Sequence, residues 1–432
     1  MDPSLIAILG FVLLFVLMLL RVPVGVAMGM VGVGGFASIA GFGPAMKLLA
    51  QSPIRTATDA GFAVIPMFLL MGAIASESGM STELFKAAHS FLGHRRGGLG
   101  MATIAACAGF AAISGSSVAT AATFSAVAYP EMRRFHYPQS FAAGVIAAGG
   151  TLGAILPPSI VLAVYSLITE QDVGKLYIAG VLPGLLAIAM YLATITLIGA
   201  LRPGFLPTTP RASWAERLAA LRGVWAIGLL FLFVVGGLYG GMFTATEAAS
   251  MGAGGAFLIA VFRRRLSAPQ LMGCLIRAVR TSAAIFTILI GALLFGYFLT
   301  VTQTPQHLTA VLAGLGIGRY GILALIMLVY LGLGCVMDAM AMVILTIPIV
   351  FPLVTSLGFD PIWFGVIIVM TVELGLIHPP VGMNVFVIKS VIGDVRIATI
   401  FAGVIPFVIT DIVRLCILIA FPAISTWLPG QM

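Results

Sequence analysis

The sequence predicts an all-α polytopic membrane protein built from two inverted repeats, each with a re-entrant helical hairpin and a broken helix. Hydrophobic residues make up 61% of the 432 residues and charged residues only 8%, which leaves too little polar surface to cover a soluble protein of this length. Apolar runs of helical length recur along the chain, whereas alternating segments of strand length are absent, so the spans are expected to be helices.

Two proline pairs reveal the repeat. Ile-Leu-Pro-Pro-Ser occupies residues 155–159 and Ile-His-Pro-Pro-Val occupies residues 377–381. The offset that relates Pro157 to Pro379 also relates Gly153 to Gly375. Matching breaks in the two halves of a membrane protein are the best pointer in a sequence to the binding site of a secondary transporter.

Five spans are expected in each half. In the first half, residues 1–201, they cover 4–20, 22–42, 60–78, 140–170 and 176–201. In the second half, residues 223–432, they cover 223–241, 244–262, 281–302, 362–388 and 397–428. An odd number of spans inverts the second half in the membrane. The linker of residues 202–222, which contains several Arg residues, is expected to be cytoplasmic because positive residues concentrate on that side, and both termini are then periplasmic.

Residues 97–130 predict a re-entrant hairpin. Arg96 and Arg133 flank this segment, so both of its ends should lie on the same side of the membrane. Small residues at 114–117 interrupt its middle and leave two arms of about 15 residues, each too short to cross the roughly 30 Å hydrocarbon core. The offset between the halves places a second hairpin at residues 319–352, which should enter from the opposite face.

Two further segments look amphipathic. Residues 47–60 and 270–283 carry spaced apolar side chains together with Arg residues. We expect them to form helices that lie in the membrane interface. Ordinary polar loops are the alternative.

The breaks suggest two Na⁺ sites. A broken helix directs carbonyl oxygens and amide groups toward one point, and cations suit the carbonyls. Because Na⁺ prefers hard oxygen ligands and small residues allow close backbone approach, each hairpin tip should form a site with one break. The first site is predicted from Ser114, Gly115, Ser116, Gly153, Leu156 and Pro158. The second is predicted from Gly334, Met337, Asp338, Gly375 and His378. Helix packing by small residues is the alternative explanation, but the recurrence at one offset favours the sites.

A substrate is expected beside these sites. The candidate substrate-binding residues are Ser117, Pro157, Ser159, Glu373, Pro379 and Asn384. Asp338 and Glu373 lie deep in apolar sequence, where acidic residues are functional candidates because their burial is costly. Either acid could bind a cation, carry a proton, or pair with a buried donor such as Asn384 or Thr371. His378 could relay a proton, donate to a substrate or have a structural role.

Other functional classes have little support in the sequence. The net charge of +8 is expected to set membrane orientation, and the absence of a basic groove with interleaved aromatics argues against nucleic-acid binding. The sequence contains no nucleotide-binding Gly-rich loop of the P-loop type, so ATP is not expected to power this subunit. An intramembrane enzyme would need a paired nucleophile and base or a metal cluster, and neither is evident. No cofactor is expected, and Na⁺ is the expected coupling ion.

Three motifs carry a family resemblance. They are Gly-x-x-Leu-Pro-Pro-Ser at residues 153–159, Cys-Val-Met-Asp at 335–338 and Gly-Leu-Ile-His-Pro-Pro-Val-Gly-Met-Asn at 375–384. Together they resemble the large membrane subunit of tripartite ATP-independent periplasmic (TRAP) transporters over nearly the whole chain. The resemblance implies an elevator-type fold, in which hairpins and broken helices move against a scaffold.

The resemblance also implies partners and a substrate class. The partners are a small four-span membrane subunit and a soluble periplasmic substrate-binding protein, in the bacterial inner membrane. The implied activity is Na⁺-coupled uptake of a carboxylate such as a C4-dicarboxylate or sialic acid. The alternative is a self-sufficient dicarboxylate symporter or anion exchanger of similar architecture, which would act without partners.

Overall fold

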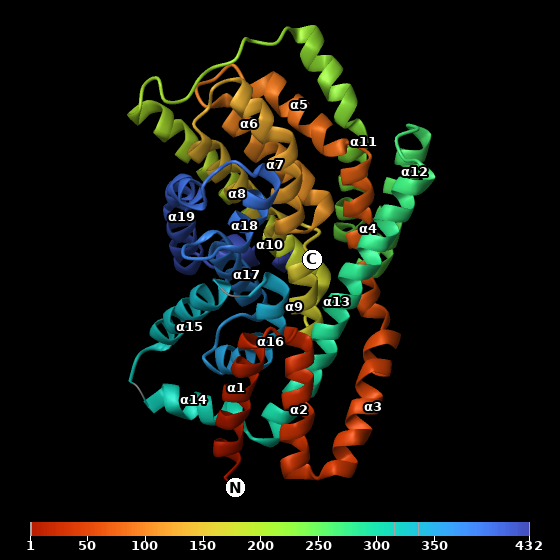
Figure 1. Ribbon diagram of the computed structural model, residues 1–432, viewed down its shortest axis with the longest axis vertical. Helices are drawn as coiled ribbons and strands as arrows, with labels where there is room; N and C mark the ends of the chain where they lie inside the picture. Colours follow the sequence, from red (N-terminus) through yellow and green to blue (C-terminus); the bar gives the residue numbers. More distant parts are fainter. Residues whose placement is uncertain (1, 315, 336, 432) are drawn as a thin grey trace.

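The computed structural model describes residues 2–314, 316–335 and 337–431, and these residues form α-helices and short 3-10 turns without a β-strand. Eight helical segments of the described chain are long and apolar enough to cross a membrane. The prediction of an all-α polytopic membrane protein is therefore confirmed. Figure 1 shows the helices in sequence colours, with α6 and α7 toward one end of the molecule and α15 and α16 toward the other.

The first half contains the following helices. They are α1 (Pro3–Leu19), α2 (Val24–Ala40), α3 (Phe42–Thr58), a 3-10 turn (Ala60–Ala63), α4 (Val64–Glu77), α5 (Met80–Leu92), α6 (Gly98–Ser114), α7 (Ser117–Arg134), α8 (Gln139–Ile155), α9 (Ile160–Thr169) and α10 (Val173–Leu201). The predicted hairpin is thus the pair α6 and α7, and the predicted broken helix is the pair α8 and α9.

The second half follows a similar order. Its helices are α11 (Trp214–Tyr239), α12 (Ala245–Phe262), α13 (Ala268–Val301), α14 (Thr304–Gly314), α15 (Arg319–Gly334), α16 (Ala339–Ser356), α17 (Pro361–Ile377), α18 (Met383–Ile392), α19 (Ile397–Ala420) and α20 (Ala423–Thr426), followed by a 3-10 turn (Pro429–Gln431). The offset between the two proline pairs also relates both bounds of α7 to those of α16, and both bounds of α8 to those of α17. The inverted orientation of the two halves stays a prediction.

Two helix boundaries and two further helices differ from the sequence prediction. Helix α11 begins at Trp214, so the last part of the predicted linker is helical, because a capping box between Ser213 and Glu216 starts the helix upstream of the apolar run. Residues 270–283 are not a separate interfacial helix but the first part of α13, which continues without a break to Val301. A capping box of Ser267 with Gln270 starts α13, and no helix-breaking cluster follows. Helices α5 and α14 were not predicted.

Glycines let α2 and α13 pack backbone to backbone. A Cβ atom on Gly25 would lie 2.6 Å from the carbonyl oxygen of Thr287, and one on Gly291 would lie 2.0 Å from the carbonyl oxygen of Gly25. Side chains larger than hydrogen would therefore force the two helices apart. Such small-residue contacts are typical of helix pairs in membranes, where burial of apolar surface does not drive association.

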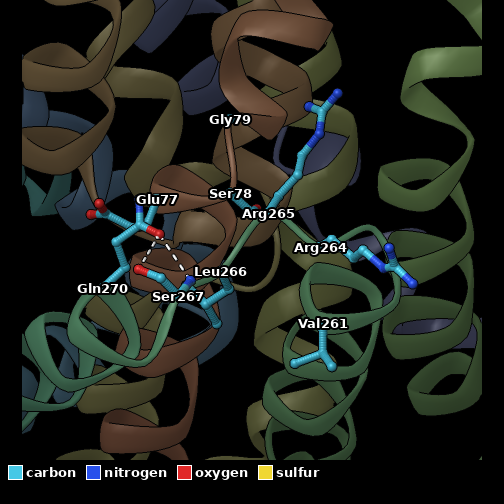
Figure 2. Close-up of a pocket in the computed structure, with 9 residues that line it drawn as sticks. All are labelled: Glu77, Ser78, Gly79, Val261, Arg264, Arg265, Leu266, Ser267 and Gln270. Atoms are coloured by element: carbon cyan, nitrogen blue, oxygen red, sulfur yellow. Dashed lines mark hydrogen bonds between the residues drawn. The ribbon is translucent and has the colours of Figure 1, made fainter.

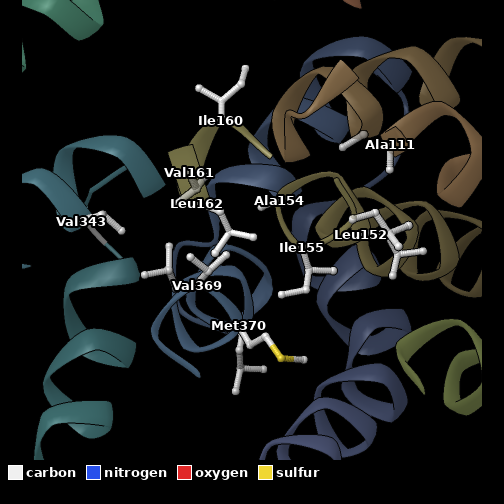
Figure 3. Close-up of a cluster of buried hydrophobic side chains, with 14 of the residues drawn as sticks. Ala111, Leu152, Ala154, Ile155, Ile160, Val161, Leu162, Val343, Val369 and Met370 are labelled. Atoms are coloured by element: carbon white, nitrogen blue, oxygen red, sulfur yellow. The ribbon is translucent and has the colours of Figure 1, made fainter. Parts of the chain in front are cut away.

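The two broken helices form the centre of the molecule. Every residue from Phe141 to Ile155 in α8 and from Trp363 to Ile377 in α17 is buried. Figure 3 shows apolar side chains packed around the break between α8 and α9, including Leu152 and Ile155 from α8, Leu162 from α9, Val343 from α16 and Met370 from α17. The irregular backbone at the break is thus surrounded by protein, as unpaired peptide groups at membrane depth require.

Candidate functional site

The turns of both hairpins line one cavity, which we call the inner cavity. It has a volume of about 610 Å³ and extends from the turns to helices α4 and α13. Its polar or charged lining residues include Ser114, Ser116 and Asp338 from the hairpins and Ser76, Glu77, Arg277 and Thr281 from α4 and α13. Segments from both halves of the chain therefore meet at one space, which the sequence motifs alone did not locate.

The first hairpin turn contacts the first helix break through its backbone. The amide of Ile160 donates a hydrogen bond of 3.2 Å to the carbonyl oxygen of Gly115. Gly115 has a φ of +59°, and a Cβ on it would lie 2.4 Å from the carbonyl oxygen of Pro158. A Cβ on Gly153 would lie 2.6 Å from the carbonyl oxygen of Ser116. Glycine is needed at both positions for this approach, and the structure brings these predicted site residues together.

Hydroxyl groups of the first turn are partly committed to local bonds. The Ser116 side chain caps α7 by accepting from the amide of Ala119 at 3.3 Å. The Ser114 and Thr120 hydroxyls lie 3.0 Å apart, and Thr120 also donates to the carbonyl oxygen of Ser116 at 2.8 Å. Each of the three hydroxyl oxygens keeps a lone pair, since a hydroxyl oxygen has two, whereas the carbonyl oxygen of Ser116 also accepts from the amide of Thr120 at 3.1 Å. The turn therefore offers several hard oxygen atoms within one short segment.

The remaining residues of the first break have different surroundings. The Leu156 side chain packs against α10, where a Cβ on Gly184 would lie 2.5 Å from its Cδ2 atom. The peptide bond between Pro157 and Pro158 is cis. Ser159 is fully buried, donates to the carbonyl oxygen of Ala154 at 2.5 Å and accepts from the amide of Leu162 at 3.1 Å. Its hydroxyl thus caps α9, and Ser159 is not among the residues that line the inner cavity.

The second hairpin turn meets the second break in a comparable way. A Cβ on Gly334 would lie 2.8 Å from the Cα of Gly375, so the two backbones touch at glycines. Asp338 caps α16, because its Oδ1 atom accepts from the amides of Met340 at 3.0 Å and Ala341 at 3.1 Å. Met337 is buried with 3% of its surface exposed. This turn therefore contributes a carboxylate where the first turn has hydroxyls.

His378 ends α17 at the second break. Its amide donates to the carbonyl oxygen of Leu374 at 3.0 Å, and its Nδ1 atom is buried without a hydrogen-bond partner among the described residues. The Cys335 thiol lies 3.7 Å from the carbonyl oxygen of Pro379, and the following peptide bond, to Pro380, is also cis. Neither His378 nor Pro379 is among the residues that line the inner cavity.

Three predicted substrate-binding residues form a cluster beneath the cavity wall. Asn384 is fully buried and donates from Nδ2 to the Oγ atom of Ser117 at 2.7 Å. The Glu373 carboxylate lies beside the Ser117 hydroxyl. Glu373 is 2% exposed. The structure therefore brings these three residues together, but not to the surface of the inner cavity.

The donor atoms at the two turns suit an alkali cation better than a transition metal. Among the described residues, no group of three or more His, Cys, Asp or Glu side chains is arranged to hold a metal ion. The turns instead present hydroxyl, carbonyl and carboxylate oxygens, which are the ligands that hard cations prefer. The two Na⁺ sites nevertheless stay predictions.

Comparison with known proteins assigns this chain to a family. The family model described as "Tripartite ATP-independent periplasmic transporter, DctM component" matches residues 11–424. The chain belongs to the DctM family. It is therefore a multi-pass inner-membrane subunit of a three-part transporter and not an enzyme.

Relatives of this DctM-family chain cover it almost completely. The C4-dicarboxylate TRAP transporter large permease protein DctM of Pseudomonas aeruginosa is 39% identical over 404 residues, which cover 93% of this chain and 94% of that protein. The isethionate TRAP transporter permease protein DctMQ of Oleidesulfovibrio alaskensis is 31% identical over 437 residues, or 99% of this chain and 67% of that protein. The YdaH transporter of Alcanivorax borkumensis superposes with a TM-score of 0.62 at 14% identity, covering 91% of this chain and 90% of that one, and so shares the fold.

The DctM-family chain has an ion pair in the inner cavity that sequence reasoning did not assign to the site. Arg277 on α13 binds Glu77 at the end of α4, with 2.7 Å between Nη2 and Oε2. Arg277 was placed in an interfacial helix from its amphipathic surroundings. The signal that could have placed it here is that α13 has no helix-breaking residue between Arg277 and its apolar run.

A second, more open cavity, which we call the outer cavity, adjoins the inner cavity in this DctM-family chain. It has a volume of about 630 Å³ and is lined by the junctions between α4 and α5 and between α12 and α13. Figure 2 shows Arg264 and Arg265 on one side of it and Glu77, Ser267 and Gln270 on the other. Glu77 lines both cavities, so its ion pair with Arg277 lies where the two adjoin.

A buried charged network was also missed. Tyr191 on α10 donates to both carboxylate oxygens of Asp411 on α19, at 2.8 and 2.9 Å. Arg414 binds the same carboxylate at 2.9 Å, and its guanidinium lies over the Tyr191 ring. Both charged side chains are buried. Two opposite charges close together in an apolar span were a usable signal, since intramembrane charges pair when they are buried.

Proposed function

We propose that this chain is the transport subunit of a Na⁺-coupled importer of organic anions. The observation that carries the proposal is the convergence of both hairpin turns on one cavity, with Ser116 from one turn and Asp338 from the other. Cavities between broken segments of two repeats are where secondary transporters bind substrate and ion. The two relatives named for C4-dicarboxylate and isethionate support a carboxylate or sulfonate as the anionic group of the substrate.

Two Na⁺ sites flank this cavity in the proposal. One would lie between the first turn and the first break, where the Pro158 carbonyl oxygen approaches Gly115 and the Ser116 carbonyl oxygen approaches Gly153. The other would lie between the second turn and the second break, where Gly334 and Gly375 touch and Asp338 adds a carboxylate. Binding of Na⁺ would fix the turns that line the cavity, and this would couple the ion to the substrate.

The movement proposed is an elevator motion of the hairpins and broken helices against a scaffold. The moving part would comprise α6–α9 and α15–α18, and α1–α4 with α11–α13 would be the scaffold. The matched bounds of α7 and α16, and of α8 and α17, support two related halves, residues 1–201 and 223–432. We propose that these halves are inverted relative to each other, so that exchange of their conformations exposes the cavity to alternate sides.

The proposed partners are a small four-span membrane subunit and a periplasmic substrate-binding protein. The three-part description of the family supports this set. The test is uptake of labelled succinate and isethionate into proteoliposomes, with and without an inward Na⁺ gradient and with each partner omitted in turn. Uptake that needs Na⁺ and all three proteins would support the proposal. Uptake by this chain alone would favour a self-sufficient symporter, and uptake independent of Na⁺ would exclude the coupling.

A further inference from the structure

Arg277 is the one cation among the described residues that line the inner cavity. The other charged lining residues are Glu77 and Asp338. Arg277 projects from α13 and Glu77 from α4, while Asp338 belongs to the second hairpin turn. An organic anion that enters this cavity therefore meets two carboxylates and a single guanidinium, and without the guanidinium it would be repelled.

The ion pair with Glu77 leaves most of the N–H donors of the Arg277 guanidinium without a partner in the described part of the chain. Nη2 binds Oε2 of Glu77 at 2.7 Å and also lies 3.3 Å from the thiol of Cys274. For Nη1 and Nε, the described residues provide no hydrogen-bond acceptor. A guanidinium has five N–H donors in a planar fork that matches a carboxylate or sulfonate. The guanidinium could thus bind the anionic group of a ligand in addition to the Glu77 carboxylate, without a change in the position of α13.

The ion pair is also exposed enough to be displaced. The Arg277 side chain is 55% exposed and the Glu77 side chain 30% exposed, and ion pairs in such surroundings contribute little to stability. Glu77 also faces the outer cavity, where Arg264 and Arg265 add positive charge (Figure 2). Arg265 binds Glu83 at 2.7 Å, whereas the described residues provide no ion-pair partner for Arg264. Positive charge in a cleft attracts anions toward it.

We propose that Arg277 binds the anionic group of the transported substrate, and that Glu77 is the competing carboxylate that holds the guanidinium in the absence of substrate. This inference rests on the proposed function, because it assigns a residue to the substrate of that transporter. Displacement of Glu77 by the substrate breaks one contact between α4 and α13 on the side of the outer cavity. The ion pair thereby acts as a gate between the two cavities.

The experiment measures substrate affinity without the binding protein. The purified membrane subunits are heated in detergent with increasing sodium succinate or sodium isethionate, with sodium chloride at matched ionic strength as the control. The anion concentration that gives half of the maximal rise in Tm reports apparent affinity. Arg277→Gln should raise that concentration about 10-fold or more, because a hydrogen-bonded charge is lost. Arg280→Gln, on the same helix but outside the cavity lining, should leave it unchanged.

Glu77 provides the second arm of the test. If Glu77 competes with the substrate, Glu77→Gln should lower the half-saturating concentration by about 2- to 5-fold, the range expected for loss of an exposed ion pair. If the pair is only structural, Glu77→Gln and Arg277→Gln would shift the titration in the same direction, and the exchanged pair E77R/R277E would restore it. That result would overturn the proposal, as would a wild-type protein that neither anion stabilises or an Arg277→Gln titration equal to wild type.

The two proposals fail in different ways. Failure of the proposed function would appear as uptake that needs neither Na⁺ nor partners, whatever the effect of Arg277→Gln on binding. If only the Arg277 assignment is wrong, the thermal titration of Arg277→Gln would equal that of the wild type, and Na⁺-dependent uptake by the wild type would persist. Arg277→Lys separates charge from geometry, since lysine keeps the charge and loses the planar fork. An affinity between those of wild type and Arg277→Gln is expected, and an affinity equal to that of Arg277→Gln would show that the fork carries the binding.

Discussion

Asn384 donates a hydrogen bond of 2.7 Å to the hydroxyl of Ser117, and this bond joins the second broken helix to the first hairpin. Asn384 lies in α18 and Ser117 at the start of α7. Both side chains are buried, so water cannot replace the bond when it is lost. The contact ties the two halves of the chain together directly beneath the turn that lines the inner cavity.

Ser117→Ala should therefore destabilise the protein. Removal of the acceptor leaves the buried amide of Asn384 unpaired, which costs about 1 to 3 kcal/mol. Thermal unfolding in detergent would measure the loss as a lower Tm. Ser125→Ala is the matched control, because Ser125 is buried in the same helix and donates only to the carbonyl oxygen of Ala121 in the preceding turn. Equal losses of Tm in both variants would show that the bond between halves contributes nothing of its own.

Asp338 combines two roles that substitutions can separate. Its Oδ1 atom caps α16, and the proposed second Na⁺ site uses its charge. Asparagine caps a helix about as well as aspartate, so Asp338→Asn should keep Tm close to wild type while raising the Na⁺ concentration for half-maximal uptake about 10-fold. Asp338→Ala should lose the cap as well, at a cost of about 1 kcal/mol. Normal Na⁺ dependence in Asp338→Asn would remove Asp338 from the ligands.

Gly334 and Gly375 set the distance between the second turn and the second break. Gly334→Ala would place a Cβ 2.8 Å from the Cα of Gly375. Because two backbones cannot yield as a side chain does, the turn must move, and overpacking of this kind costs about 1 to 3 kcal/mol. We expect a lower Tm and weaker Na⁺ dependence of uptake.

Gly332 in the same helix supplies the control for this variant. A Cβ on Gly332 would meet no atom within 4 Å, and alanine favours helix more than glycine does. Gly332→Ala should thus leave both Tm and the Na⁺ titration unchanged or slightly improved. If Gly334→Ala behaved like Gly332→Ala, close approach of the turn and the break would not matter for ion binding.

Sequence reasoning succeeded where structure is encoded locally. The proline pairs and small residues that break the helices have the same effect wherever the helices pack, and so the turns at Gly115 and near Asp338 and the ends of α8 and α17 could be placed. The constant offset between the proline pairs then located the hairpin and the broken helix of the second half from those of the first. The position of a helix break depends mainly on residues adjacent in the sequence, such as Pro and Gly, so it can be predicted without knowing how the helices pack.

Contacts between distant segments were harder to predict. Asp411 accepts from Tyr191, 220 residues earlier, and Arg277 binds Glu77, 200 residues earlier. Nothing in the local sequence pairs these residues, because the pairing follows from how α10, α19, α4 and α13 pack. Asn384 illustrates the intermediate case. The sequence offered it as one possible buried donor to Asp338 or Glu373, whereas its amide donates to Ser117.

A contact between the linker after α10 and His89 predicts how the stability of the protein depends on pH. Thr209 in this linker binds His89 of α5, with 3.1 Å between the hydroxyl and Nε2, and its amide donates to the carbonyl oxygen of Gly93 at 3.2 Å. Burial holds the pKa of His89 below its usual value of 6.5, and the carboxylate of Glu131 opposes this shift in part. The neutral imidazole is therefore the form that the folded protein favours.

Acidification should weaken the folded state through His89. Below about pH 6.5 the unfolded chain takes up a proton at this position before the folded chain does, so the free energy of unfolding falls as the pH drops through that value. Between about pH 7.5 and 5.5, the Tm of the wild type should fall further than that of His89→Gln, whose side chain does not titrate. His136→Asn replaces an exposed histidine at a positive φ, which asparagine tolerates, and should retain the wild-type pH dependence. A fall in Tm that is equal in wild type and His89→Gln would assign the acid sensitivity to other groups.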